Sequence, residues 1–288
     1  MLYLIAASLL WALSFGVIKQ SLAAVDPALV GFLRLLLALP LFLPFVRPRA
    51  LDRRLALALV AIGAVEYGLM YGFYLAAFAH LDAYQVALFT IATPLYVTLW
   101  DDLRGRAFDP FALAMALLAI AGAALIRYQG LALRDLLVGF ALVQAANLCF
   151  AVGQVEYRRL RQRRPALKDA PAQALLFLGG LVVTALHTTL AGAWPSARAI
   201  DGPALLALLY LGVVASGLGF FAWSRGSVQV SAGALAVLNN LKVPFAVAIS
   251  LLVFGERTDL LRLLVGGAVM IAATILAERR AERRVRPA

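Results

Sequence analysis

Two ionisable residues lie deep inside long apolar stretches of this 288-residue sequence. Lys242 lies about ten residues into the stretch 232–254 and Glu66 about eleven residues into the stretch 55–79, roughly 15 Å from the start of each stretch if both are helical. Stretches of that length span a membrane, and a charge at mid-depth costs about 3 kcal/mol or more, so it faces a cavity or a partner. Two interpretations stay open. Either Lys242 contacts an anionic group of a ligand and Glu66 exchanges a proton, or the two side chains form a buried ion pair.

Amide side chains accompany the two charges. Asn239 shares a helical face with Lys242, three residues further along. Gln144, Asn147 and Gln154 fall on one helical stripe of the stretch 136–156. Such a stripe indicates either a hydrated face or hydrogen bonds between helices.

Aromatic residues and one arginine complete the candidate set. Tyr67 and Tyr71 are four residues apart in the stretch 55–79, too deep for an interfacial aromatic belt. They either line a cavity, where a ring and a hydroxyl suit an amphipathic solute, or pack against other helices. Arg34 lies toward one end of the stretch 27–46, so its long side chain is expected to extend to the membrane interface.

The composition is that of an integral membrane protein. Hydrophobic residues make up 64% and charged residues only 14% of the chain, and the mean hydropathy is +0.90, whereas soluble domains contain about 25% charged residues. One cysteine, Cys149, excludes an intrachain disulfide. No phosphate loop, nucleophile elbow or metal-binding helix motif occurs. The sequence therefore predicts no enzyme, no metal and no cofactor.

Ten apolar stretches have the length of a membrane crossing, namely 2–20, 27–46, 55–79, 84–100, 110–126, 136–156, 171–193, 203–223, 232–254 and 260–277. With the N-terminus inside, 18 of the 26 basic residues fall on inner connections, including the linker 157–170 after the sixth stretch and the basic tail. Basic residues resist translocation. The prediction is a multi-pass protein of the cell (inner) membrane with both termini cytoplasmic, and the net charge of +11 follows from this topology and not from nucleic-acid binding.

The back half of the chain repeats landmarks of the front half. Three residues recur after 150 positions: Pro94 as Pro244, Gly105 as Gly255, and Asp109 as Asp259. Four more recur after 149 positions: Gly63, Val65, Gly68 and Leu69 as Gly212, Val214, Gly217 and Leu218. Each half contains five of the ten stretches. An odd number of crossings inverts the second copy relative to the first, as in many secondary transporters.

Several segments resemble the EamA-type branch of the drug/metabolite transporter superfamily. They are Trp11-Ala-Leu-Ser14-Phe15-Gly, Phe32-x-Arg34-x-x-x-Ala38, and Pro244 followed by Phe254-Gly255-Glu256-Arg257-Thr258. The resemblance implies an all-α membrane protein of ten transmembrane helices, built as two five-helix inverted-topology repeats at 1–127 and 128–288. It also implies alternating access around a central cavity, for which the matching residues are Ser14, Glu66, Tyr67, Tyr71, Thr93, Asn147, Ser216, Asn239 and Lys242.

The expected function is secondary transport. The polar sixth stretch and the aromatic third and fourth stretches resemble the aromatic amino-acid exporter branch, which implies export of aromatic, hydrophobic or other amino acids, with the substrate carboxylate near Lys242. An exporter of drugs, amines or other small metabolites is the alternative, although a fixed positive charge at Lys242 repels cations. A non-transporting scaffold or receptor is an alternative of another class. The expected partners are a small-molecule substrate, membrane lipid and, through Glu66, a proton.

Overall fold

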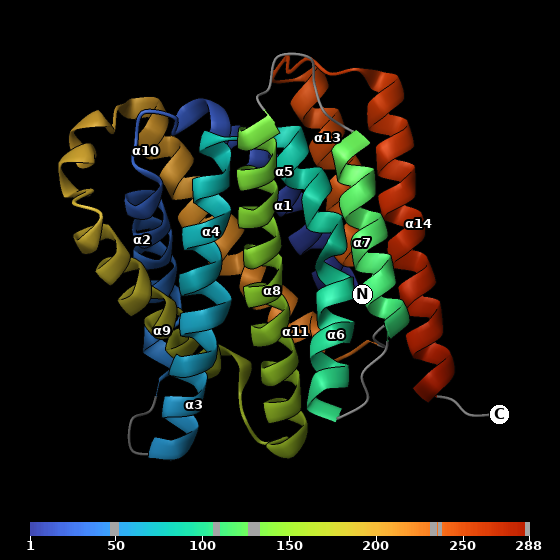
Figure 1. Cartoon of the computed structure of the whole chain (residues 1–288). Coiled ribbons are helices and arrows are strands. Elements are labelled where there is room, and N and C mark those ends of the chain that lie inside the picture. Colours follow the sequence, from blue (N-terminus) through green and yellow to red (C-terminus); the bar gives the residue numbers. More distant parts are fainter. Residues whose placement is uncertain (47–51, 106–109, 126–132, 231–234, 236–237, 286–288) are drawn as a thin grey trace.

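The computed structural model describes residues 1–46, 52–105, 110–125, 133–230, 235 and 238–285, which form a bundle of helices with no strand in these ranges (Figure 1). Within them, six helical segments are long and apolar enough to cross a membrane: Leu2–Ser21, Arg53–Ala79, Ala83–Arg104, Leu133–Arg163, Asp169–Leu190 and Gly202–Ser227. Shorter apolar helices occupy Pro27–Leu41, Leu238–Leu252 and Leu260–Leu276. Helix α7 (Pro110–Leu125) completes the set of helices found at the ten expected stretches. Ten membrane crossings remain a prediction.

The first two helices are α1 (Leu2–Ser21) and α2 (Pro27–Ala38). Helix α2 begins where the sequence favours it, because the Asp26 carboxylate accepts a hydrogen bond from the Ala28 amide at 2.8 Å and Pro27 occupies the first turn. The expected helix to residue 46 is wrong. Pro40 and Pro44 divide its end into two short 3-10 turns, η1 (Leu39–Leu41) and η2 (Leu43–Phe45), because proline cannot donate a backbone hydrogen bond.

A π-helical segment interrupts the third expected stretch and the eighth. The third consists of α3 (Arg53–Gly63), the π-helix η4 (Ala64–Leu69), α4 (Met70–Ala76) and η5 (Ala77–Ala79). The eighth consists of α10 (Gly202–Leu209), the π-helix η8 (Tyr210–Leu218) and α11 (Gly219–Ser227). π-Helical segments are rare in proteins, and those that occur are often found at functional sites. Both π-helices end at the equivalent leucine of the repeat, since Leu69 and Leu218 are 149 positions apart.

The repeated prolines Pro94 and Pro244 each follow a break in a helix. The fourth stretch consists of α5 (Ala83–Phe89), the 3-10 turn η6 (Thr90–Ala92) and α6 (Thr93–Gly105). In the ninth, a turn at Leu241 separates helical residues 238–240 from α13 (Lys242–Leu252). This break lies shortly before Pro244, and it places Lys242 at the first residue of a helix.

The remaining helices are long. They are α8 (Leu133–Arg163), α9 (Asp169–Leu190) and α14 (Leu260–Val285), with a 3-10 segment, η7 (Trp194–Ala199), between α9 and α10. Helices α7 and α14 pack side by side at one edge of the bundle (Figure 1). Leu261 and Leu264 of α14 are about 70% exposed, which suits a helix in contact with lipid.

The turn after α13 binds the start of α5 in the other half of the chain. Gly255 has a φ of 69°, a conformation that favours glycine. It presents Glu256, whose carboxylate oxygens accept hydrogen bonds from the amides of Ala83 at 2.8 Å and Tyr84 at 3.0 Å. This contact satisfies the free amides at a helix N-terminus with a charged acceptor.

Hydrogen bonds from Lys19 also stabilise the end of the bundle that contains this turn. The Lys19 ammonium at the end of α1 donates to the carbonyls of Phe78 at 2.9 Å and Leu81 at 2.8 Å. Burial raises the pKa of Asp82, and the Glu256 carboxylate raises it further while Lys19 opposes both. The carboxyl of Asp82 therefore takes up a proton at a higher pH than an exposed aspartate does.

Glu256→Ala is expected to destabilise the protein by about 2–4 kcal/mol, because two amides at the start of α5 lose a charged acceptor. Thermal unfolding of the purified protein in detergent measures the change. Asp259→Ala is the matched control, since Asp259 accepts from Leu261 and Arg262 at 3.0 and 3.2 Å only within its own turn, and it should cost about 1 kcal/mol. Equal losses in the two variants would contradict the stabilising contact between the halves.

Candidate functional site

A cavity of about 80 Å³ lies inside the bundle. Segments from both halves of the chain meet at this cavity. Its lining comes from helices α1, α2, α4, α6, α8, α11 and α13 and from η6. The lining consists of Trp11, Ser14, Phe15, Arg34, Met70, Tyr71, Tyr74, Thr90, Thr93, Ala146, Asn147, Phe150, Phe220 and Lys242.

Five of the nine residues predicted from the sequence line this cavity: Ser14, Tyr71, Thr93, Asn147 and Lys242. The other four are buried behind the lining. Asn239 and Ser216 hydrogen-bond to residues of the lining, whereas Glu66 and Tyr67 lie one helical turn from it. The predicted set therefore divides into a lining and a supporting layer.

Lys242 is held at one wall of the cavity. Its side chain is 7% exposed, its Nζ donates to Asn239 Oδ1 at 3.2 Å, and Nζ lies 5.3 Å from the centroid of the Trp11 ring. The amide oxygen and the aromatic face both stabilise a cation. No ion pair joins Lys242 to Glu66 in the described residues, so the ion-pair interpretation is not supported there.

Arg34 is a second cation in the same lining, and the expectation that it extends to the interface is wrong. The residue is 3% exposed. Its Nε donates to Ser216 Oγ at 3.1 Å, and its guanidinium carbon lies 4.4 Å from the centroid of the Tyr71 ring. The Tyr71 hydroxyl hydrogen-bonds to the same Ser216 Oγ at 2.7 Å. These contacts fix the guanidinium on one side and leave Nη1 without a hydrogen-bond partner in the described structure.

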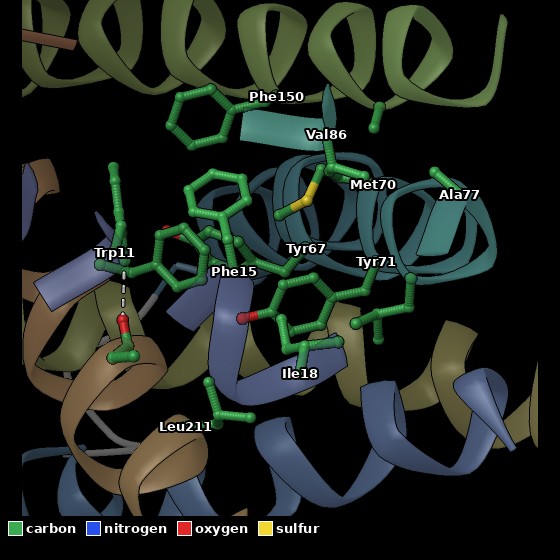
Figure 2. Close-up of a cluster of buried hydrophobic side chains, with 14 of the residues drawn as sticks. Trp11, Phe15, Ile18, Tyr67, Met70, Tyr71, Ala77, Val86, Phe150 and Leu211 are labelled. Atoms are coloured by element: carbon green, nitrogen blue, oxygen red, sulfur yellow. Dashed lines mark hydrogen bonds between the residues drawn. The ribbon is translucent and has the colours of Figure 1, made fainter. Parts of the chain in front are cut away.

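Aromatic rings form much of the remaining wall. Trp11 lies 5.1 Å from Phe220 and 6.1 Å from Phe150, centroid to centroid, and Phe15 lies 5.9 Å from Tyr74. Figure 2 shows Trp11, Phe15 and Phe150 gathered with Tyr71 and Met70. The Trp11 indole Nε1 donates to the carbonyl of Ala215 at 2.9 Å, which anchors the ring to the π-helix η8.

Two amides of the α8 stripe donate to one carbonyl at the helix break before Pro94. Asn147 Nδ2 and Gln144 Nε2 donate to the carbonyl of Phe89 at 3.0 and 3.3 Å. Thr93 Oγ1 lies 2.7 Å from the carbonyl of Thr90 and 3.1 Å from Asn147 Oδ1. Helix-to-helix hydrogen bonding thus describes Gln144 and Asn147, while Asn147 also borders the cavity. Gln154 is buried further along, and its Nε2 has no partner in the described residues.

Glu66 occupies a narrow space on the π-helix η4. It is 2% exposed, and it packs so closely on Gly153 of α8 that a Cβ at Gly153 would lie 2.2 Å from the Glu66 Cβ. The neighbouring Tyr67 hydroxyl accepts a hydrogen bond from Gln173 Nε2 at 3.2 Å and lies 3.5 Å from Ser224 Oγ. The polar groups in this region face the interior of the bundle and not its surface.

The chemistry of the lining is that of a receptor for an anion with an apolar body. Two cations and several aromatic rings line the cavity, and its described lining contains no carboxylate. Within the described residues, no three acidic, histidine or cysteine side chains form a group that could hold a metal ion. The lining is therefore suited to binding and orienting a small molecule.

Comparison with known proteins identifies the family of this chain. The model of the EamA-like transporter family matches residues 1–128 and 137–278. A "Probable biotin transporter" of Pseudomonas aeruginosa is 40% identical over 275 residues, which cover 95% of this chain and 96% of that protein. The "Biotin transporter" of Salmonella typhimurium is 36% identical over 277 residues, 95% of this chain and 91% of that protein.

More distant relatives extend the comparison. A "Probable amino-acid metabolite efflux pump" of Salmonella typhimurium is 28% identical over 282 residues, covering 91% of this chain and 89% of that protein. A protein of known crystal structure with 21% identity shares the fold, with a TM-score of 0.66 over 98% of both chains. Because the family model covers both halves and relatives of 40% and 36% identity span almost the whole chain, this protein is a membrane transporter of the EamA-like family.

Proposed function

We propose that this protein transports biotin, or a closely similar monocarboxylate with a compact ring system. The observation that carries this proposal is that Arg34 and Lys242 line the same aromatic-walled cavity. Biotin presents one carboxylate on a flexible aliphatic chain and a fused bicyclic body. A guanidinium with a free Nη1 suits the carboxylate, and the rings of Trp11, Phe150 and Phe220 suit the apolar body.

The charge of the cavity lining favours a monoanion over an amino acid. An amino acid carries an ammonium group that needs an acceptor, and the nearest buried carboxylate, Glu66, is not part of the lining. A zwitterion would place its ammonium among two cations, which is unfavourable. Export of amino acids remains the second candidate because of the efflux-pump relative. The same two cations argue more strongly against drugs and amines with a permanent positive charge.

The size of the cavity supports alternating access. Pockets for small molecules have volumes of about 300–1,000 Å³, and this cavity measures about 80 Å³. The helices around it must therefore separate before a substrate of this size enters. The breaks before Pro94 and Pro244 and the two π-helices lie in the segments that border the cavity, where such a movement would need flexible joints.

We further propose ten crossings with both termini cytoplasmic, as two inverted five-helix repeats at 1–127 and 128–288. The distribution of basic residues supports this orientation. The π-helices at equivalent positions of the two halves support the repeat. In this orientation the lower end of the bundle in Figure 1, where α8 ends, is the cytoplasmic end.

Exchange of radiolabelled biotin in liposomes tests the substrate. Purified protein in liposomes preloaded with unlabelled biotin is expected to take up external labelled biotin. Excess unlabelled biotin outside should block this uptake. The methyl ester of biotin should not, because it keeps the rings and removes the anion. Exchange of phenylalanine or another amino acid without exchange of biotin would overturn the assignment in favour of the second candidate.

A further inference from the structure

Glu66 lies one helical turn beyond the cavity. It precedes Met70 by four residues, and its packing partner Gly153 follows Phe150 by three. Met70 and Phe150 both line the cavity, and α4 and α8 pack against each other. Glu66 is therefore separated from the substrate space by Met70 and Phe150, on the side toward the end of α8.

The surroundings of Glu66 lack a counter-ion. Its Oε2 has no hydrogen-bond partner, and no ion pair involves it in the described part of the chain. Gly153 leaves room for the carboxyl group, because a Cβ there would lie 2.9 Å from Oε2. An ionised carboxylate is expensive in such a place, whereas a carboxyl group that carries a proton is tolerated.

The groups around Glu66 are polar but uncharged. On the same π-helix, Tyr67 is the adjacent titratable group, and α9 contributes Gln173, whose Oε1 has no partner in the described residues. Helix α8 contributes Tyr157, whose hydroxyl donates to Asp169 at 3.4 Å. Arg161 pairs with that aspartate at 3.1 Å and so does not neutralise Glu66.

We propose that Glu66 is a proton-binding site that couples transport to a pH gradient, with one proton moving alongside each substrate carboxylate. This inference rests on the proposed monocarboxylate substrate. The proton binds to a Glu66 carboxylate oxygen on one side of the membrane and leaves it on the other. The substrate anion and the proton together carry no net charge across.

The balance of buried charges favours movement of the proton and the substrate in the same direction. Without substrate, Arg34 and Lys242 contribute two positive charges, and ionised Glu66 contributes one negative charge. With substrate, the bound carboxylate replaces that negative charge while Glu66 is neutralised by a proton. The empty and the loaded protein then bury the same net charge, so net charge does not favour reorientation of one form over the other. Proton exchange in opposite directions would give the two forms different charges.

Two measurements on the same liposomes test the coupling. An exterior that is one pH unit more acidic than the interior is expected to drive wild-type protein to concentrate biotin about tenfold inside the liposomes. The reason is that an electroneutral one-to-one symport makes the biotin gradient equal to the proton gradient. Glu66→Gln should keep biotin exchange within about twofold of wild type, since glutamine is similar in shape to a neutral carboxyl group. The same variant should not accumulate biotin. Glu156→Gln is the matched control, because Glu156 lies on α8 at an ion pair with Arg104 and should leave accumulation intact.

The outcomes separate this inference from the proposed substrate. Absence of exchange in wild-type protein would refute biotin as substrate. Exchange without a response to the pH gradient, a response to a sodium gradient instead, or accumulation by Glu66→Gln would each refute the proton site.

A measurement on unaltered protein removes the dependence on the folding of the variant. Binding of biotin to purified wild-type protein in a weakly buffered solution is expected to take up about one proton per biotin at some pH between about 6 and 9. A pH-sensitive dye reports the uptake. If no proton is taken up across that range, the proposal is overturned whether or not Glu66→Gln folds.

Discussion

Arg34→Gln is expected to lower the initial rate of biotin exchange at low biotin concentration by on the order of 10- to 100-fold. Hydrogen bonds to charged groups contribute about 1.5–3 kcal/mol, and the loss of the guanidinium removes both the charge and the unpaired Nη1 donor. The protein should still fold, because the Tyr71 hydroxyl keeps its 2.7 Å hydrogen bond to Ser216 and Ser216 Oγ keeps its 2.6 Å bond to the carbonyl of Leu211.

Two further arginine variants make this result specific. Arg34→Lys should retain part of the exchange, since an ammonium keeps the charge and loses the planar fork that pairs with a carboxylate. Arg225→Gln is the matched control. Arg225 also lies over an aromatic ring, that of Tyr3 at 5.2 Å, but it is not in the cavity lining, so exchange should be unchanged. If Arg34→Gln exchanges biotin like wild type, Arg34 has no contact with the substrate and the proposed function loses its main support.

The burial of Arg34 shows where sequence reasoning stops. The sequence places Arg34 near the end of an apolar stretch that reaches residue 46, which favours an interfacial side chain. The α-helix ends at Ala38, however, and Ser216 and Tyr71 from distant parts of the chain supply the hydrogen bond and the ring that hold the guanidinium inside. These partners are 182 and 37 residues away from Arg34 in sequence, so no local pattern reveals them.

The residues that could be predicted share a different property. Lys242, Asn147 and Tyr71 are polar groups near the middle of spanning stretches, and the cost of their burial is sufficient to predict a cavity or a partner. The resemblance to EamA-type transporters added Ser14 and Thr93. The cost of burial alone does not distinguish the cavity from its supporting layer, so it predicts Asn239 as part of the lining. Ser216 is predicted there by the resemblance alone.

The π-helices were not predictable from periodicity. A π-segment adds a residue to a turn without changing the apolar character of the stretch, so a pattern of hydrophobic residues continues through it. Only the equivalent landmarks at 63–69 and 212–218 connected the two regions in the sequence. Glu66 and Ser216 both lie on these segments.

Gly179→Ala is expected to destabilise the protein strongly, because α3 and α9 meet there backbone to backbone. A Cβ at Gly179 would lie 1.9 Å from the carbonyl oxygen of Val60, and a Cβ at Gly63 would lie 1.8 Å from that of Leu176. Close approach through small residues is a common basis of helix packing in membranes. A carbonyl oxygen in a helix cannot rotate away as a side chain can, so the two helices must separate.

The expected cost of Gly179→Ala is about 3 kcal/mol, at the upper end of the range for overpacking, with a similar cost for Gly63→Ala. Thermal unfolding in detergent and the yield of monodisperse protein measure it. Gly72→Ala is the control, on the spanning segment that contains Gly63, because a Cβ there would lie 3.5 Å from the His187 ring, an ordinary contact. Since η4 begins directly after Gly63, separation of α3 from α9 would also displace Glu66 and Tyr67. Any folded fraction of Gly179→Ala should therefore respond less to a pH gradient than Gly72→Ala does. Equal stability of Gly179→Ala and Gly72→Ala would show that the helices do not approach as closely as described.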